Sequence, residues 1–180
     1  KGREWQLAVG MLSTMAQAKV ERDTISYSAA VSACEKDGEW QLAVGMFSTM
    51  EQAKVERNTI SYNAAISACE KSREWQIALA LLSTMAPAKV ESDSIRHHAV
   101  MSACEKDREW QLALALLSTM APAKVARTTI SHDAGLSALE KSREWQLAWG
   151  LLRAMAQAKV ESDRISCSAA MSACEKGREW

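Results

Sequence analysis

Residues 59–93 read TISYNAAISACEKSREWQIALALLSTMAPAKVESD, and nearly the same 35 residues recur on both sides of this stretch. One tryptophan marks each copy at a constant spacing. These tryptophans are Trp5, Trp40, Trp75, Trp110, Trp145 and Trp180. A fixed period of this size is typical of a solenoid, in which each unit buries its apolar face only against its neighbours. The spacing therefore predicts a single repeat array over residues 1–180.

The period divides this array into complete and partial copies. The complete copies are residues 24–58, 59–93, 94–128 and 129–163, with a partial copy at 1–23 and another at 164–180. The chain begins with Lys1 and stops at Trp180 within a copy, so we interpret it as a fragment of a longer array.

Each copy contains the patterns of two helices. Apolar residues spaced i, i+3, i+4 and i+7 predict one buried face on a helix. In the first helix these are Tyr27, Ala30, Val31 and Cys34, and in the second a similar face has Trp40, Ala43, Phe47 and Met50. Thr24, or the Asp or Asn that directly precedes the equivalent position in a copy, can cap the first helix. Pro87 and Pro122 should end the second helix of their copies. No β-branched run alternates with polar residues, which excludes strands.

Composition limits the function classes. The chain is 48% hydrophobic, which excludes a disordered chain, and its apolar runs are too short to cross a bilayer. Twenty-two basic groups balance 22 acidic ones, so net charge provides no general attraction to nucleic acid or membranes. No targeting segment is visible in this sequence.

The two helix patterns resemble those of pentatricopeptide repeats. Residues 60–71 are similar to the first helix of that family, which reads Val-Thr-Tyr-Asn-x-Leu-Ile-x-x-Leu/Cys-x-Lys, and residues 75–85 resemble its Ala-Leu-x-Leu-Phe-x-x-Met segment. Tetratricopeptide repeats differ in having 34 residues and a tryptophan in the first helix. The end of each copy departs from the family, since Lys54 or Lys89 stands where the family often has glycine. The resemblance implies an all-α, right-handed α-solenoid.

The resemblance also implies single-stranded RNA as the partner, with one base facing each repeat on the side of the first helices. The second residue of a repeat would be an apolar wedge between bases, here Ile25, Ile60, Ile95, Ile130 and Ile165. The fifth and last residues would contact the base edge. The fifth residues are Ser28, Asn63, His98, Asp133 and Ser168, and the last residues are Asn58, Asp93, Thr128 and Asp163.

Hydrogen-bonding chemistry suggests base preferences for two copies. An ionised Asp only accepts hydrogen bonds and suits the ring N–H of uracil or guanine, whereas an Asn amide can donate to adenine or cytosine. The copy with Ser28 and Asn58 should prefer adenine, and the copy with Asn63 and Asp93 should prefer uracil. The two later copies match no regular pair. We expect these two to act as degenerate spacers.

Alternative interpretations stay open for these positions. Asn58 and Asp93 also suit helix caps, and the isoleucines also suit packing. A lysine recurs once per copy and would track phosphates, or would simply be a solvated residue at a helix C-terminus. These lysines are Lys36, Lys71, Lys106, Lys141 and Lys176. The row of glutamates directly beside them, beginning with Glu35, should blunt their charge.

The remaining reactive residues favour packing over chemistry. Cys34, Cys69, Cys104 and Cys174 share one place in the repeat, which Leu139 fills in another copy, so we expect buried free thiols. The histidines lack zinc-like spacing, and no phosphate loop or nucleophile–base arrangement is visible. We expect no metal and no cofactor. The tryptophan row and Trp149 should be core.

The sequence therefore predicts a non-enzymatic, sequence-selective, single-stranded RNA-binding array. The resemblance implies a role in chloroplast or mitochondrial RNA processing, editing, stability or translation. Other proteins remain as alternative partners, because a tetratricopeptide-like scaffold would use the same surface. DNA and membranes are not expected as partners. A catalytic domain of a longer protein, outside this segment, is a third possibility.

Overall fold

The computed structural model describes residues 4–85, 94–120, 129–158, 160 and 162–177. Every regular element over these residues is an α-helix. The helices are α1 (Glu4–Gln17), α2 (Thr24–Asp37), α3 (Trp40–Gln52), α4 (Thr59–Lys71), α5 (Trp75–Met85), α6 (Ser94–Lys106), α7 (Trp110–Met120), α8 (Thr129–Ser142), α9 (Trp145–Gln157) and α10 (Arg164–Gly177). The predicted all-α fold of paired helices is confirmed.

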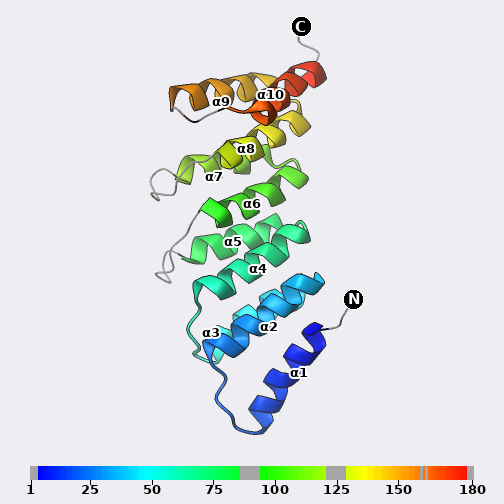
Figure 1. The fold of residues 1–180 in the computed structure, drawn as a ribbon, viewed down its shortest axis with the longest axis vertical. Coiled ribbons are helices and arrows are strands. Elements are labelled where there is room, and N and C mark those ends of the chain that lie inside the picture. Colours follow the sequence, from blue (N-terminus) through cyan, green and yellow to red (C-terminus); the bar gives the residue numbers. More distant parts are fainter. Residues whose placement is uncertain (1–3, 86–93, 121–128, 159, 161, 178–180) are drawn as a thin grey trace. The chain divides into compact units, whose positions relative to one another are not determined.

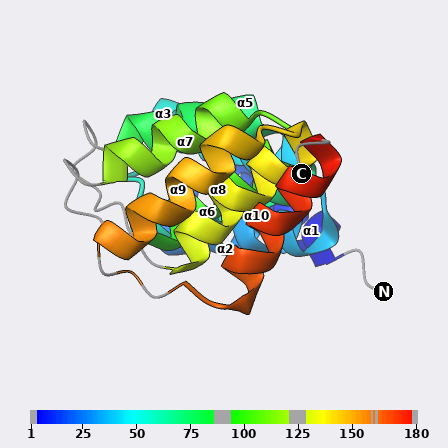
Figure 2. The same cartoon turned by 90° about the horizontal axis from the view of Figure 1, so that it is seen from above.

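The chain forms two compact units, Lys1–Glu91 and Ser92–Trp180, which we call unit 1 and unit 2. In unit 1, the first helices α2 and α4 contact each other, and the second helix α3 contacts both of them. In unit 2, α8 lies between α6 and α10, and α9 contacts α8 and α10 (Figures 1 and 2). The second helices α3, α7 and α9 each contact two consecutive first helices, which is the packing of an α-solenoid.

Side-chain caps explain where the first helices begin. The Asp23 carboxylate accepts a hydrogen bond from the Ser26 backbone N–H, and Asn58 forms a reciprocal capping box with Ser61. Each cap satisfies a donor that the helix leaves unpaired. Asn58 is therefore a helix cap, as one of the alternative interpretations held. Helices α5 and α7 end at Met85 and Met120, while Pro87 and Pro122 lie outside the described residues.

The predicted apolar faces form the core. In unit 1, Tyr62, Val31 and Ile66 are at most 1% exposed, and the Phe47 and Tyr62 rings meet edge-on with centroids 4.7 Å apart. The same faces of α8, α9 and α10 form a buried cluster in unit 2. Cys34, Cys69 and Cys104 are fully buried free thiols, which confirms the packing interpretation.

The tryptophan prediction was wrong in part. Trp149 is 61% exposed, and the described members of the tryptophan row are only half-buried. Leu114 occupies the equivalent place one copy earlier, and it packs against the core cluster of the helices that follow it. Among the described residues no second helix follows α9 to cover Trp149 in the same way. Its exposure depends on the neighbouring repeat, which helical periodicity alone does not report.

A left-handed residue closes the turn within each helix pair. Gly38 has a φ of 80°, and Arg73, Arg108 and Arg143 occupy the equivalent place with φ between 62° and 64°. Lys54 stands where the resembled family often has glycine, at the end of the second helix, and has a φ of 54°. The turn therefore keeps the glycine-type backbone conformation although the residue is lysine.

Replacing Lys54 with glycine is expected to raise the free energy of unfolding by about 1 kcal/mol, because a side chain is strained in the left-handed region. Urea unfolding followed by circular dichroism would measure the change. Lys54→Ala is the matched control, since it removes the charge and keeps the strained Cβ. An equal gain in both variants would show that charge, and not backbone strain, is responsible.

The buried thiols give a second stability prediction. Burial raises the pKa of Cys69 and of Cys104 to about 11, from an ordinary value of 9.0. The folded chain favours the neutral thiols, so their contribution to stability is present below pH 9 and is lost as the pH rises toward 11. Alkylation by iodoacetamide at pH 8 should be much slower in the native chain than in urea, because the thiolate is the nucleophile. Equal rates in both states would contradict this burial.

Candidate nucleic-acid interface

In four of the first helices, the second residue faces away from the core. Ile25, Ile60, Ile130 and Ile165 are 76%, 59%, 65% and 62% exposed, respectively. The side chain of Ile95 lies outside the described residues. The apolar stripe of the same helix begins two positions later, on the opposite side, which explains this orientation. None of the four described isoleucines is therefore packed in the interior.

The fifth residues lie where one first helix meets the next. Ser28 is 4% exposed, and its hydroxyl donates to Asn58 Oδ1 over 3.3 Å. His98 Nε2 lies 2.5 Å from Ser131 Oγ, and Asp133 Oδ1 accepts a hydrogen bond from Ser166. The structure thus brings Ser28 and Asn58 together, with the Ser28 side chain buried where α2 meets the start of α4.

The other predicted reading residues differ in their surroundings. Asn63 is half-buried, and its Oδ1 is buried with no hydrogen-bond partner among the described residues. Ser168 is exposed, as is Asp163. The other two last residues, Asp93 and Thr128, lie outside the described residues.

Asp133 sits in a partly desolvated environment. Burial raises the pKa of its carboxyl group and the nearby Asp163 charge acts in the same direction, while the hydrogen bond from Ser166 opposes the rise. Asp163 has a lowered pKa chiefly because the backbone N–H of Ser166 donates to it. The two carboxylates of this copy therefore share one serine.

The predicted lysine row forms ion pairs with the glutamate row. Lys71, Lys141 and Lys176 each contact the glutamate of the preceding copy, at N–O distances of 2.5, 2.8 and 2.6 Å. These glutamates are Glu35, Glu105 and Glu140, and each also accepts a hydrogen bond from a serine on the following first helix. Lys36 and Lys106 are exposed at the ends of α2 and α6.

The electrostatic effect of these pairs is local. Burial acts to raise the pKa of Glu140. The hydrogen bonds from Lys176 and Ser172 nevertheless hold this pKa below its usual value. The paired lysines keep 40–48% of their side chains exposed. A phosphate could therefore reach them, but it would meet a lysine whose charge is already partly neutralised.

A hollow of about 430 Å³ lies between α8 and α10, and we call it the α8–α10 hollow. Its lining includes the fifth residues Asp133 and Ser168, the exposed Ile165, and Arg164 and Glu140. Acceptor, donor and apolar groups thus border one space between adjacent first helices.

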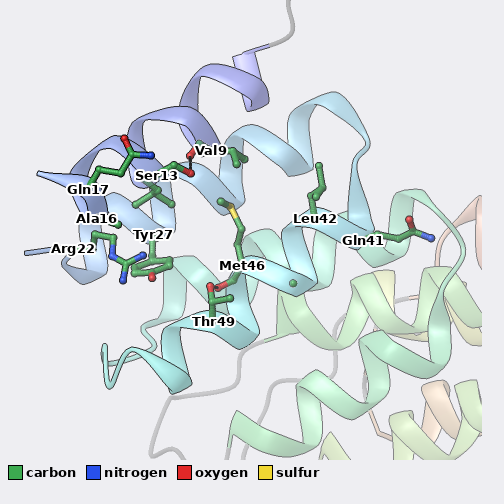
Figure 3. A pocket seen from close by; sticks show the side chains of 12 residues that line it. Val9, Ser13, Ala16, Gln17, Arg22, Tyr27, Gln41, Leu42, Met46 and Thr49 are labelled. Carbon is green, nitrogen blue, oxygen red and sulfur yellow. Dashed lines mark hydrogen bonds between the residues drawn. The ribbon is translucent and has the colours of Figure 1, made fainter. Parts of the chain in front are cut away.

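A larger hollow of about 540 Å³ lies between α1, α2 and α3 (Figure 3). Its wall includes Leu12, Tyr27 and Met46 and contains none of the predicted RNA-facing residues. One copy later, Phe47 stands in the place of Leu12 and its ring packs on Tyr62. The hollow therefore lies where one copy packs differently from the next, and it is on the side of the second helices.

Other site types find no support in the part of the chain that the structure describes. No three His, Cys, Asp or Glu side chains there come together as metal ligands. None of the described helices combines the length and the apolar character needed to span a membrane.

Sequence comparison finds family matches over part of the chain. A sequence model described as pentatricopeptide repeat domain matches residues 11–72, and a PPR repeat model matches residues 60–86. Residues 11–86 of the chain thus match the pentatricopeptide-repeat family. The 35-residue period carries the same repeat pattern through the remaining residues. No curated protein sequence matches the chain.

Solved pentatricopeptide-repeat structures share the fold. The crystal structure of PPR10 from maize is 21% identical, with a TM-score of 0.72 over 98% of this chain. PPR10 in complex with an 18-nt psaJ RNA element is 15% identical, with a TM-score of 0.77 over 94%. The chain spans only 25% of PPR10. The PPR domain of Arabidopsis thaliana protein-only RNase P 1, in complex with tRNA, is 10% identical with a TM-score of 0.80, covering 96% of this chain and 91% of that domain.

The third-position serines were not recognised as site residues from the sequence. Ser61, Ser131 and Ser166 are fully buried at the start of their helices. A detectable signal was present, because serine occupies this position in every copy from residue 24 onward except the one with Arg96. Its buried setting and its partners come only from the structure.

Proposed function

We propose that the chain binds single-stranded RNA along the exposed isoleucine row of its first helices. The observation that carries this proposal is the exposure of Ile25, Ile60, Ile130 and Ile165, which are the described side chains at this repeat position. A regular row of bare aliphatic side chains is unfavourable in water and suggests a binding surface. Base faces offer flat apolar area that can cover such side chains, and an unpaired strand can present them.

The hydrogen bonds of Asn58 support the predicted adenine preference of its repeat. Asn58 Oδ1 accepts from Ser28 and from the Ser61 backbone N–H. The amide NH₂ then remains to donate, and adenine carries a ring-nitrogen acceptor. For the next repeat we propose uracil, through Asn63 and Asp93. At one base per repeat, four complete copies would contact about four or five nucleotides.

Phosphate contacts from the lysine row are part of this proposal. The ion pairs of Lys71, Lys141 and Lys176 reduce the positive charge that each offers. Binding should therefore weaken as salt rises, with a slope smaller than five free lysines would give. We place this non-catalytic activity in organellar RNA processing, editing, stability or translation, as the family resemblance implies.

A direct test compares single strands with duplexes. Fluorescence anisotropy would follow the intact chain binding a labelled eight-nucleotide RNA that contains an adenine–uracil step, alone or annealed to its complement. We expect the single strand to bind more tightly by about ten-fold or more, because stacked duplex bases cannot cover the isoleucines. Equal binding of both forms would contradict the proposed function.

The ion-paired lysines and the zero net charge favour one other candidate, a protein-binding scaffold. In that case the isoleucine row would contact apolar side chains of a partner protein. The same titration separates the two, since a scaffold would show no preference for unpaired RNA.

A further inference from the structure

In two repeats of unit 2, the serine at the third position contacts the fifth residue of the repeat before it. Ser131 and Ser166 are fully buried, and a buried hydroxyl needs a hydrogen-bond partner. Ser131 Oγ lies 2.5 Å from His98 Nε2, and Ser166 Oγ lies 2.5 Å from Asp133 Oδ1. Both contacts connect adjacent first helices of unit 2.

The Ser166 backbone is fixed independently of this contact. Asp163 Oδ1 accepts hydrogen bonds from the backbone N–H groups of Ile165 and Ser166, at 2.8 and 2.9 Å. The Ser166 hydroxyl is 3.2 Å from the same oxygen but only 2.5 Å from Asp133 Oδ1. A hydroxyl carries one hydrogen, so the shorter contact takes it. The helix cap therefore holds Ser166 in place while its hydroxyl holds Asp133.

A serine hydroxyl suits both junctions because it both donates and accepts. The Ser166 hydroxyl donates to the carboxylate of Asp133. The Ser131 hydroxyl donates to His98 Nε2 or accepts from it, according to the tautomer of the imidazole. In unit 1 the short side chain of Ser28 instead bonds to Asn58, and Ser61 completes the capping box of that residue. In all three of these contacts between first helices, a residue at the start of the next first helix thus hydrogen-bonds to the fifth residue of the preceding repeat.

We propose that the third-position serine is a positioning residue, which fixes the orientation of the preceding repeat's fifth residue and thereby the atom offered to an RNA base. This inference rests on the proposed RNA-binding function. For Asp133, Ser166 occupies Oδ1 and leaves Oδ2 as the acceptor at the α8–α10 hollow. An acceptor there suits the ring N–H of uracil or guanine, so this repeat is not a neutral spacer.

The first experiment needs no RNA. Carbon-13 NMR of the Asp133 carboxyl group would follow its titration in the native chain and in Ser166→Ala, Ser166→Thr and Ser172→Ala. The lost hydrogen bond stabilises the charged carboxylate, so we expect Ser166→Ala to raise the Asp133 pKa and Ser166→Thr to restore it.

Ser172→Ala is the matched control. Ser172 lies on the same helix and donates to Glu140 on α8 over 2.8 Å, so its loss removes a similar contact between the same two helices. We expect it to leave the Asp133 pKa unchanged. An unchanged pKa in Ser166→Ala, or an equal rise in Ser172→Ala, would overturn the positioning role.

The second experiment measures recognition. Single-stranded oligonucleotides that vary one base at a time would be titrated against the same variants. We expect the native preference at the base facing Asp133 to fall by about five-fold or more in Ser166→Ala, and to persist in Ser166→Thr and Ser172→Ala. Unchanged selectivity alongside a raised pKa would exclude a part in recognition. Absence of RNA binding in the native chain would refute the proposed function, while the NMR titration would still decide the hydrogen bond.

Discussion

Replacing both Ile25 and Ile60 with serine is expected to weaken binding of single-stranded RNA by about thirty-fold. Each side chain is mostly exposed in the free chain, at 76% and 59%. Covering roughly half of an isoleucine with a base contributes about 1 kcal/mol, and the two contributions should add because the sites contact different bases. Two losses of about 1 kcal/mol each correspond to an affinity about thirty-fold weaker.

The double variant should keep its fold, because exposed side chains contribute little to the core. Met11→Ser is the matched control, since Met11 is an exposed apolar residue at 65% and lies on α1, outside the isoleucine row. Anisotropy titrations of the three proteins at one salt concentration would give the comparison. An equal loss in Met11→Ser would indicate nonspecific apolar adhesion, and full binding by the double variant would remove the isoleucines from the interface.

Replacing Tyr62 with alanine is expected to lower the free energy of unfolding by about 4 kcal/mol. Tyr62 is fully buried between α3 and α5, with its ring against Phe47 and its hydroxyl 3.3 Å from the Thr84 carbonyl oxygen. Truncation removes the aromatic contact and leaves a cavity between the second helices α3 and α5. The neighbouring core cannot collapse fully into that space.

Tyr62→Phe provides the reference for this experiment. It keeps the ring and removes only the hydroxyl, so the expected loss is about 1 kcal/mol. Urea unfolding of both variants, followed by circular dichroism, would separate ring packing from hydrogen bonding. If alanine and phenylalanine reduce stability equally, the hydroxyl and not the packed ring is the dominant contribution.

The sequence alone determined the repeat, the helix pairs and the buried faces. The 35-residue period, the spacing of Tyr27, Ala30, Val31 and Cys34, and the interchange of cysteine with Leu139 all depend on local periodicity and residue type. Helical geometry converts such spacing directly into a face, whatever lies opposite. Helical geometry also directs the isoleucines away from the apolar stripe, so their exposure follows from one helix at a time.

Only the tertiary structure decided which side chains meet across repeats. Ser28 with Asn58, Lys71 with Glu35 and Ser166 with Asp133 are separated by 30, 36 and 33 residues. Whether such residues touch depends on the rotation and stagger of one first helix against the next, which the intervening second helix sets by packing on both. The exposure of Trp149 depends in the same way on a neighbouring helix. A repeating sequence reports the unit, whereas the contacts between units require their packed geometry.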